Sequence, residues 1–397
     1  MDVEVRTLAG DDELEQAWLL DRQAFNSPAA ERDRWLQGLV PERTHGVFVD
    51  DRLVGMGTVH ALGQFFGGRS VPMGGVASVA VAPDHRGRGI ASALLQSMLP
   101  AMRAWGEVIS TLSPATTRLY RGLGWEVAGV HGGRAVPARS LNQLRAGAGA
   151  SVRQAGRDDL PAIAACYGRV APRTNGFVDR PEWYWEQTLG ARWNERYVYV
   201  VDGDDDDGGV DGYMNYEHLR SPVGWGYGLR VHDIVARHAD ALLALWRTVG
   251  SSASQVREVH FCGPPEDPLL LLLPEQDLTY HTVLRWMLRL VDAPGAVAAR
   301  GFPHGVDVTV DLEVRDRQCE WNDGTWRLVV SGGRGKLERG GLGTVRIGIG
   351  TFSSLWSGYA SARTLELIGG LTGATAKDRD ALDAVFAGPT PWMVDAF

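Results

Sequence analysis

The sequence has little of what marks several large classes of protein. Its three cysteines, Cys166, Cys262 and Cys319, lie far apart and form no Cys-x-x-Cys pair, which excludes a disulfide scaffold or a cysteine-rich zinc site. The ten histidines form no His-Glu-x-x-His motif and no i,i+4 pair, so we expect no metal. An excess of positive charge is also missing. The net charge of −8 argues against a nucleic-acid partner.

Long apolar runs are absent as well. The most apolar run, Leu269 to Leu273, is bracketed by prolines and is too short to cross a bilayer. The N-terminal segment is acidic and amphipathic, unlike a signal peptide. We therefore expect a cytoplasmic protein with no membrane partner. The acidic balance suits cationic small molecules or peptides, although solubility alone would also account for it.

The length and composition are those of a globular protein with more than one domain. Hydrophobic residues make up 44% of the chain, and 397 residues exceed one ordinary core. Gly147–Ala150 is a plausible linker, and the character of the sequence changes again near Leu290. We expect domains at residues 1–148, 149–290 and 291–397.

The first domain alternates helical and strand patterns, which predicts a mixed α/β fold. The expected order is helix, helix, three strands, helix, strand, helix, strand. A bulge or bend is expected at Gly74-Gly75, within the third strand. The expected elements are helices over 10–25 and 31–39, a hairpin over 46–62, a strand over 71–82, a helix over 88–105, a strand over 108–112, a helix over 116–123 and a strand over 125–130.

The second domain repeats part of this order. Strands over 197–202 and 212–218 form a hairpin, and a helix over 239–249 follows where the first domain has its helix at 88–105. The third domain has strand patterns over 306–314 and 325–330 and ends with helices.

One segment of the first domain carries a binding motif. Val76–Ala91 reads as a strand, a glycine-rich loop and an amphipathic helix. Gly87 and Gly89 let the backbone turn sharply and leave N–H groups uncovered at the positive end of the helix dipole, an anion site suited to pyrophosphate. Arg86 and Arg88 add charge-assisted contacts. The alternative is a plain helix-capping turn with two solvated arginines. The strand before the loop and the helical periodicity after it favour the anion site.

This segment resembles the acetyl-CoA signature of the GNAT superfamily, Arg/Gln-x-x-Gly-x-Gly/Ala, with Arg86, Gly89 and Ala91 at the matching positions. The resemblance implies acetyl-CoA as co-substrate, with its pantetheine arm along the preceding strand. The residues it implies for cofactor binding are Ser78, Val79, Ala80, Val81, Arg86, Gly87, Arg88, Gly89, Ile90 and Ala91. The matching position before the helix over 239–249 has no such loop. A related second domain would therefore have lost its phosphate site.

Leu119–Glu126 resembles the second signature of the superfamily, a tyrosine on a short helix followed by a glycine turn. The resemblance implies that Tyr120 is the general acid that protonates the CoA thiolate. A phenol with a pKa near ~10 can hydrogen-bond a thiolate and pass it a proton. The alternative reading of Tyr120 is a half-buried aromatic residue on an amphipathic helix.

The whole chain resembles the Eis (enhanced intracellular survival) branch: a GNAT domain, a degenerate second GNAT-like domain and a domain similar to sterol carrier proteins. This branch implies a homo-oligomer, typically a hexamer, and a general-base role for the C-terminal carboxylate, here that of Phe397. A carboxylate with a pKa of roughly 3.5 would need desolvation or a water relay. The apolar tail, Pro389–Phe397, is expected to be docked. The alternative is an ordinary packed terminus.

The branch also implies an aromatic, acidic pocket around the amine, for which Phe25, Trp35 and Asp395 are the candidates. Asn26 and Ala396 stand where acidic residues are usual, which reduces the negative charge there. The expected function is acetyl transfer to the primary amine of a small cationic, aminoglycoside-like acceptor by direct attack. The alternatives are acetylation of lysines or peptides, and a non-catalytic protein that binds acyl-CoA or lipid.

Overall fold

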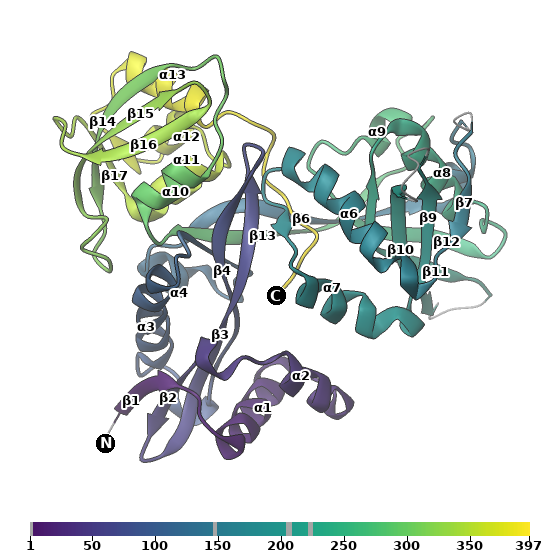
Figure 1. The fold of residues 1–397 in the computed structure, drawn as a ribbon, viewed down its shortest axis with the longest axis horizontal. Coiled ribbons are helices and arrows are strands. Elements are labelled where there is room, and N and C mark those ends of the chain that lie inside the picture. The colour runs from purple at the N-terminus through teal and green to yellow at the C-terminus, as the bar shows by residue number, and fades with distance from the viewer. Residues whose placement is uncertain (1–2, 146–148, 204–208, 221–224) are drawn as a thin grey trace. The chain divides into compact units, whose positions relative to one another are not determined.

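The computed structural model describes residues 3–145, 149–203, 209–220 and 225–397, so Gly147 and Ala148 of the predicted linker lie outside it. The chain forms two compact units. The first unit comprises residues 1–128, 286–388 and 396–397, and the second comprises 129–285 and 389–395. Residues 291–388, predicted as a separate domain, thus share a unit with the N-terminal residues. Figure 1 shows the elements of both units.

The N-terminal part of the first unit is a twisted sheet with strand order β1-β2-β3-β4-β5-β13, in which only β4 and β5 run parallel. The strands are β1 (Val3–Thr7), β2 (Thr44–Val49), β3 (Arg52–Phe66), β4 (Arg69–Val81), β5 (Ile109–Leu112) and the end of β13 (Thr279–Leu290). The helices are α1 (Asp11–Phe25), α2 (Arg32–Gly38), α3 (Ile90–Ala104) and α4 (Thr117–Gly122). The helices and strands predicted over residues 10–123 are confirmed, whereas β1 and β13 were not predicted.

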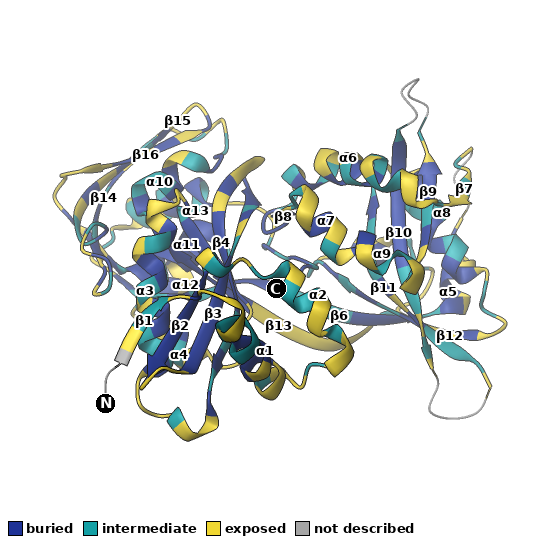
Figure 2. Cartoon of the chain, turned by 60° about the horizontal axis from the view of Figure 1, so that its bottom comes forward, coloured by how far each residue is buried: buried dark blue, intermediate teal, exposed yellow. Residues whose placement is uncertain are grey.

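Helix α3 connects the two parallel strands and packs on β3 through its apolar stripe. Ile90, Leu94 and Met98 are buried, as the helical spacing predicts. Two glycines of β3 let the helix approach: a Cβ on Gly55 would lie 2.6 Å from Ile90, and one on Gly57 would lie 2.8 Å from Met98. In Figure 2, β2, β3 and β4 are dark blue along most of their length, so the core lies around these strands.

The bulge predicted at Gly74-Gly75 is at a different place in β4. Gly74 and Gly75 stay in register with Ala61 and His60 of β3. The register shifts further on, where Ser78 and Val79 together oppose Gly57. The two glycines instead make room for side chains. A Cβ on Gly74 would lie 2.4 Å from the sulfur of Met102, and one on Gly75 would clash with an aromatic ring described below.

The rest of the first unit is a five-stranded sheet, with order β16-β15-β14-β17-β18, and helices that cover it. The strands are β14 (Val308–Arg315), β15 (Gly324–Ser331), β16 (Arg334–Arg339), β17 (Val345–Gly348) and β18 (Leu371–Thr372), and the helices are α10 (Ala293–Ala299), α11 (Ile349–Ser357), α12 (Ala362–Leu367) and α13 (Ala376–Val385). The strands expected over 306–314 and 325–330 and the helices near the end are confirmed, whereas β16, β18 and α10 were not predicted.

The second unit has strand order β6-β12-β11-β10-β9-β7, again with one parallel pair, β11 and β12, joined by a helix. The strands are β6 (Glu126–Pro137), β7 (Val152–Gln154), β8 (Val178–Asp179), β9 (Tyr197–Asp202), β10 (Val210–Arg220), β11 (Tyr227–Ala236) and β12 (Val256–Gly263), and the helices are α5 (Ala138–Asn142), α6 (Leu160–Val170), α7 (Glu182–Thr188), α8 (Ala239–Gly250) and α9 (Leu269–Leu272). The order β9-β10-β11-α8-β12 repeats β2-β3-β4-α3-β5.

The helix that joins the parallel pair begins differently in the two units. In the second unit, Nδ1 of His238 accepts a hydrogen bond of 3.3 Å from the N–H of Ala241, so a side chain caps α8. The neighbouring Arg237 is paired with Asp211. The N-cap residue of helix α3 is Gly89, which has no side chain to cap the helix. The second unit therefore keeps the fold of the first without its uncovered helix start. Among the described residues, no helix is long and apolar enough to span a membrane.

A half-buried histidine of β3, His60, makes the stability of the first unit depend on pH. Burial, helped by the charge of Arg43, lowers the pKa of His60 to about 4 from 6.5. The unfolded chain therefore binds more protons than the folded chain between pH 6.5 and 4, so stability is lost as the pH falls through this window. Protonation of His60 should cost the wild type up to about 2 kcal/mol of its free energy of unfolding between pH 7.5 and 5. We expect His60→Gln to lose less stability over this range by the same amount. Urea unfolding of both proteins at the two pH values measures this, and equal losses would contradict it.

Candidate active site

A cavity opens beyond the point where the two parallel strands of the first unit stop pairing. Strands β4 and β5 pair only over Met73–Gly75 and Ile109–Thr111. Beyond Gly75, the edge of β4 that faces β5 pairs with no other strand of the described residues, so its backbone groups can bind a ligand. The cavity has a volume of about 670 Å³. Its walls are Ala24, Phe25, Val79, Ala80, Val81, His85, Arg86, Gly87, Gly89, Ile90, Ala91, Ser92, Ala115, Thr116, Leu119 and Tyr120.

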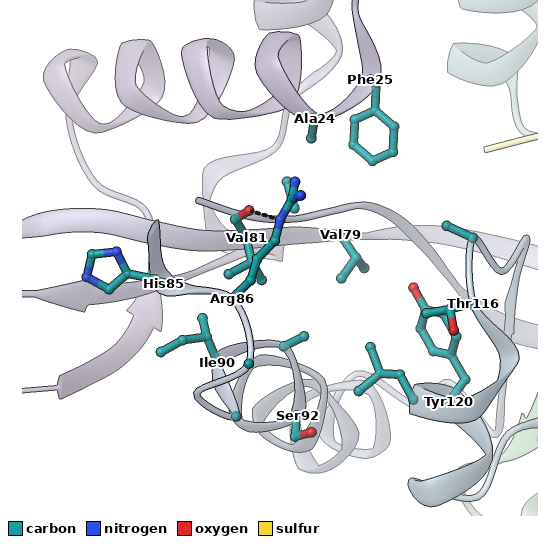
Figure 3. A pocket seen from close by; sticks show the side chains of 16 residues that line it. Ala24, Phe25, Val79, Val81, His85, Arg86, Ile90, Ser92, Thr116 and Tyr120 are labelled. Atoms are coloured by element: carbon teal, nitrogen blue, oxygen red, sulfur yellow. Dashed lines mark hydrogen bonds between the residues drawn. The ribbon is translucent and has the colours of Figure 1, made fainter. Parts of the chain in front are cut away.

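The glycine loop closes one end of this cavity. Gly87 and Gly89 have φ values of 76° and 82°, which L side chains rarely adopt, so glycine is needed for the turn. Helix α3 begins directly after Gly89 without a side-chain cap, which leaves first-turn N–H groups for an anion. Nε of Arg86 donates to the carbonyl oxygen of Val81 at 3.3 Å, and Figure 3 shows this side chain extending over the cavity.

The structure brings most of the sequence-predicted cofactor residues together. Those that line the cavity are Val79, Ala80, Val81, Arg86, Gly87, Gly89, Ile90 and Ala91. Ser78 and Arg88 are not among its walls. Sequence reasoning missed His85 and Ser92, which lie within or next to the predicted segment, and four residues from other segments: Ala24, Ala115, Thr116 and Leu119.

Tyr120 stands at the wall opposite Val79. Its side chain rises from α4 into the cavity (Figure 3) and is only 6% exposed. The ring packs edge-on against Trp125, with centroids 6.4 Å apart. Burial raises the pKa of the phenol above 10. The hydroxyl is therefore protonated at neutral pH and can donate a proton into the cavity.

A buried ion pair holds the turn that follows α4. Nη1 of Arg289 donates to the carbonyl oxygen of Leu123 at 2.7 Å, and Nη2 reaches both carboxylate oxygens of Asp316 at 2.8 Å. Gly124 has a φ of 91°, and a Cβ there would lie 1.6 Å from Arg289. Gly124, the glycine of the second signature, thus adopts the positive φ that the turn requires and leaves space for the guanidinium of Arg289. Sequence reasoning missed this pair, because its partners lie far from Tyr120 in the sequence.

The C-terminal residue lies on the strand that leads into the cavity. A Cβ on Gly75 would lie 2.9 and 3.1 Å from two ring carbons of Phe397, and 3.0 Å from Leu62. The ring therefore occupies space that only glycine leaves open on β4. Gly74 faces α3, so by the alternation of strand side chains the Phe397 ring lies on the other face of the sheet.

The rest of the tail belongs to the second unit. Trp392 bridges to Val130 of β6, and Met393 is 1% exposed, so the predicted docking of the apolar tail is confirmed. Asp395 is buried and pairs with Nε of Arg180 at 2.9 Å, while Nη1 of Arg180 reaches Asp233 at 2.6 Å. Its carboxylate is not among the walls of the cavity between β4 and β5.

The other two predicted acceptor residues are placed differently. Phe25 is 51% exposed and lines the cavity. Trp35 does not line it; its ring packs against Trp18, with centroids 5.6 Å apart, and its side chain hydrogen-bonds Asp21. Asn26 ends α1 with a φ of 56°, in the left-handed region that asparagine tolerates well.

Asp21 is a buried acid that sequence reasoning missed. It is 3% exposed, and its carboxylate accepts hydrogen bonds from Ser27, at 3.2 Å, and from the side chains of Ser78 and Trp35. Burial raises its pKa. One signal was available. Asp21 lies three residues after Trp18, on the apolar stripe of α1, where a charged residue is unusual.

These residues fit acetyl-CoA. The uncovered start of α3 and Arg86 suit a pyrophosphate, and the unpaired edge of β4 can hydrogen-bond an amide-bearing arm. Apolar side chains such as Val79, Ile90 and Leu119 supply the walls. Among the described residues, no group of three His, Cys, Asp or Glu side chains could hold a metal ion.

Comparison with known proteins agrees with this geometry. Family models described as "Acetyltransferase (GNAT) domain" match residues 4–128 and 176–290, and "Sterol carrier protein domain" matches residues 293–394. An uncharacterized N-acetyltransferase of Streptomyces griseus is 30% identical over 394 residues, with 89% of each chain covered. The chain is a GNAT N-acetyltransferase of the Eis type.

Further relatives of this Eis-type acetyltransferase cover most or all of its length. The crystal structure of a GCN5-related N-acetyltransferase from Anabaena variabilis matches with a TM-score of 0.92 and 31% identity, covering all of both chains. "N-acetyltransferase Eis" of Mycobacterium tuberculosis is 27% identical, with 81% of this chain and 79% of that protein covered. The protein therefore has two tandem GNAT domains and a C-terminal domain like sterol carrier proteins, and its family uses acetyl-CoA.

Proposed function

We propose that this acetyltransferase moves the acetyl group of acetyl-CoA to the primary amine of a small cationic, aminoglycoside-like acceptor by direct attack. The observation that carries the proposal is one cavity with an uncovered, glycine-started helix at one end and the buried phenol of Tyr120 on its wall. These are the two groups that transfer from a CoA thioester needs, an anion site and an acid. The overall negative charge suits a cationic acceptor.

In the mechanism we propose, the chain's own groups supply the proton transfers. The carboxylate of Phe397, directly or through water, accepts the proton that makes the amine nucleophilic. A backbone N–H of Ser78 or Val79 polarises the thioester carbonyl. Tyr120 donates its proton to the sulfur as the carbon–sulfur bond breaks. Bound acetyl-CoA supplies the activated acetyl group.

Other parts of the proposal concern the assembly and the acceptor site. We propose domain boundaries near residues 148 and 290, a homo-oligomer, hexameric by family resemblance, and a cytoplasmic location. Asp395 is buried and pairs with Arg180, and the half-buried Trp35 packs against Trp18 and hydrogen-bonds Asp21. We therefore expect Phe25, which lines the cavity, to contribute more directly to acceptor binding than either of them.

Thiol release from acetyl-CoA with a panel of amines tests the function. We expect release with small polyamine-like drugs, and competition by them against a lysine peptide. Preference for the peptide would favour lysine acetylation. Binding of acetyl-CoA in calorimetry without thiol release with any amine would favour a non-catalytic acyl-CoA sensor.

The anion site makes a separate prediction. Arg86→Ala should raise KM for acetyl-CoA by ~10-fold with little change in kcat, because the lost charge-assisted contact binds substrate and transition state alike. Arg88→Ala is the comparison, and a smaller rise is expected because Arg88 does not line the cavity. Steady-state kinetics with varied acetyl-CoA measure both constants. A change confined to kcat would contradict this role of Arg86.

A further inference from the structure

The bulge in β4 contains a backbone conformation that is unfavourable for its residue. Ser78 has a φ of 51°, and it is one of only four non-glycine residues with positive φ among those that the structure describes. The other three, Asn26, Asp50 and Asp51, are of the types that tolerate this region, whereas serine is not. Such a conformation persists only where the surroundings enforce it, and such sites cluster at active sites.

A side chain of α1 contacts this residue. Asp21 accepts a hydrogen bond from the side chain of Ser78, and also from Ser27 and Trp35. Asp21 is 3% exposed, and among the described residues its carboxylate forms no ion pair. An unpaired buried carboxylate is costly, so an apolar residue would serve the packing of α1 better. The carboxylate of Asp21 accepts all three hydrogen bonds, and one of the donors is the strained residue, Ser78.

The residue after Ser78 makes this contact relevant to the reaction. Val79 is the second residue of the bulge and a wall of the cavity, next to Ala80 and Val81. The φ of Ser78 sets the direction in which the backbone continues into Val79. Without the bulge, Ser78 and Val79 would return to ladder pairing with β3, and the backbone facing the cavity would change.

We propose that Asp21 is a positioning residue for acetyl transfer: its hydrogen bond to Ser78 holds the bulge of β4 in the conformation that presents the backbone of Val79 to the acetyl-CoA cavity. The inference rests on the proposed function, which places the thioester against Ser78 and Val79. Asp21 itself does not line the cavity and touches no reacting atom.

A double-mutant cycle tests the proposal, because glycine adopts positive φ without help. Asp21→Ala should lower kcat/KM by ~10-fold or more when residue 78 is serine, since the strained conformation then loses its support. In the Ser78→Gly protein, Asp21→Ala should lower kcat/KM by at most ~3-fold. This loss is measured relative to Ser78→Gly alone, so the activity of that variant does not affect the comparison. Equal losses in the two backgrounds would overturn the proposal.

Two further variants separate positioning from other roles. Leu20→Ala also truncates a buried residue of α1. Leu20→Ala should lower the melting temperature, and its effect on kcat/KM should be the same with serine or glycine at position 78. If Ser78→Gly rescued the activity of Leu20→Ala as well as that of Asp21→Ala, the cycle would report only stability. Asp21→Asn keeps an acceptor oxygen for Ser78 and should retain more activity than Asp21→Ala. If the two are equally impaired, the charge of Asp21 is what matters, and the positioning role is wrong.

The proposed function and this inference fail in different ways. Calorimetry with acetyl-CoA needs no acceptor, and Asp21→Ala should weaken the affinity when residue 78 is serine but much less when it is glycine. If the wild-type protein releases no thiol with any amine, the proposed function fails while the calorimetric cycle still decides the role of Asp21. If wild-type turnover is normal and neither cycle shows coupling, only the inference fails.

Discussion

Tyr120→Phe is expected to lower kcat by ~10²- to 10⁴-fold, the usual contribution of a positioned general acid. The substitution removes one oxygen from a side chain that is 6% exposed and leaves the ring packed on Trp125. The fold and the KM for acetyl-CoA should therefore change little. Because burial raises the pKa of Tyr120, the phenol stays protonated and the wild-type rate should not fall through loss of this acid below pH 10.

The control for Tyr120→Phe is the same chemical change at a surface tyrosine. Tyr280 is 47% exposed and does not line the cavity, so Tyr280→Phe should keep the wild-type rate. Thiol release gives the rates, and thermal unfolding checks that both variants fold. If Tyr120→Phe kept its rate within a few-fold of wild type at unchanged stability, the assignment of the acid would be wrong.

Deletion of Phe397 is expected to lower kcat by ~10²-fold or more. The deletion moves the terminal carboxylate back to Ala396 and removes the ring that lies against Gly75. Phe397→Ala keeps a carboxylate at position 397 but loses the ring contact, so we expect an intermediate rate. Steady-state kinetics of the two variants separate the carboxylate from the ring. An active protein without Phe397 would contradict its role as the base.

Gly75→Ala tests the same site without touching the tail. The added Cβ would lie 2.9 Å from the Phe397 ring, closer than real contacts allow, so the ring must move. We expect a fall in kcat that is smaller than that caused by the deletion. Gly305→Ala is the matched control, because a Cβ there meets nothing within 4 Å. It should leave the rate unchanged.

The sequence predicted best those features that are local in the chain. The loop from Arg86 to Ala91 lies within a strand–loop–helix unit, and its two glycines, uncovered helix start and apolar stripe could all be read from neighbouring residues. Tyr120 belongs to a similar short motif, the helix α4 and its glycine turn. Both segments line the cavity in the structure.

Features that depend on distant contacts were predicted poorly. The bulge was expected at Gly74-Gly75, because glycines often mark bulges, but it lies at Ser78, where α1 provides a carboxylate. The two glycines are needed for the side chains of Met102 and Phe397, which are distant in sequence. The partner of Asp395 is distant as well: the family resemblance implied a place for Asp395 in the acceptor pocket, and in the structure its carboxylate pairs with Arg180.

We propose that the cavity between β4 and β5 transfers acetyl groups to amines. The most direct test measures acetylated amine and free CoA thiol together in one reaction of the full-length protein with acetyl-CoA and a primary amine. We expect one acetylated amine for each thiol released, with both products falling together in Tyr120→Phe. Thiol release that does not depend on the amine, or acetyl-CoA binding without either product, would contradict it.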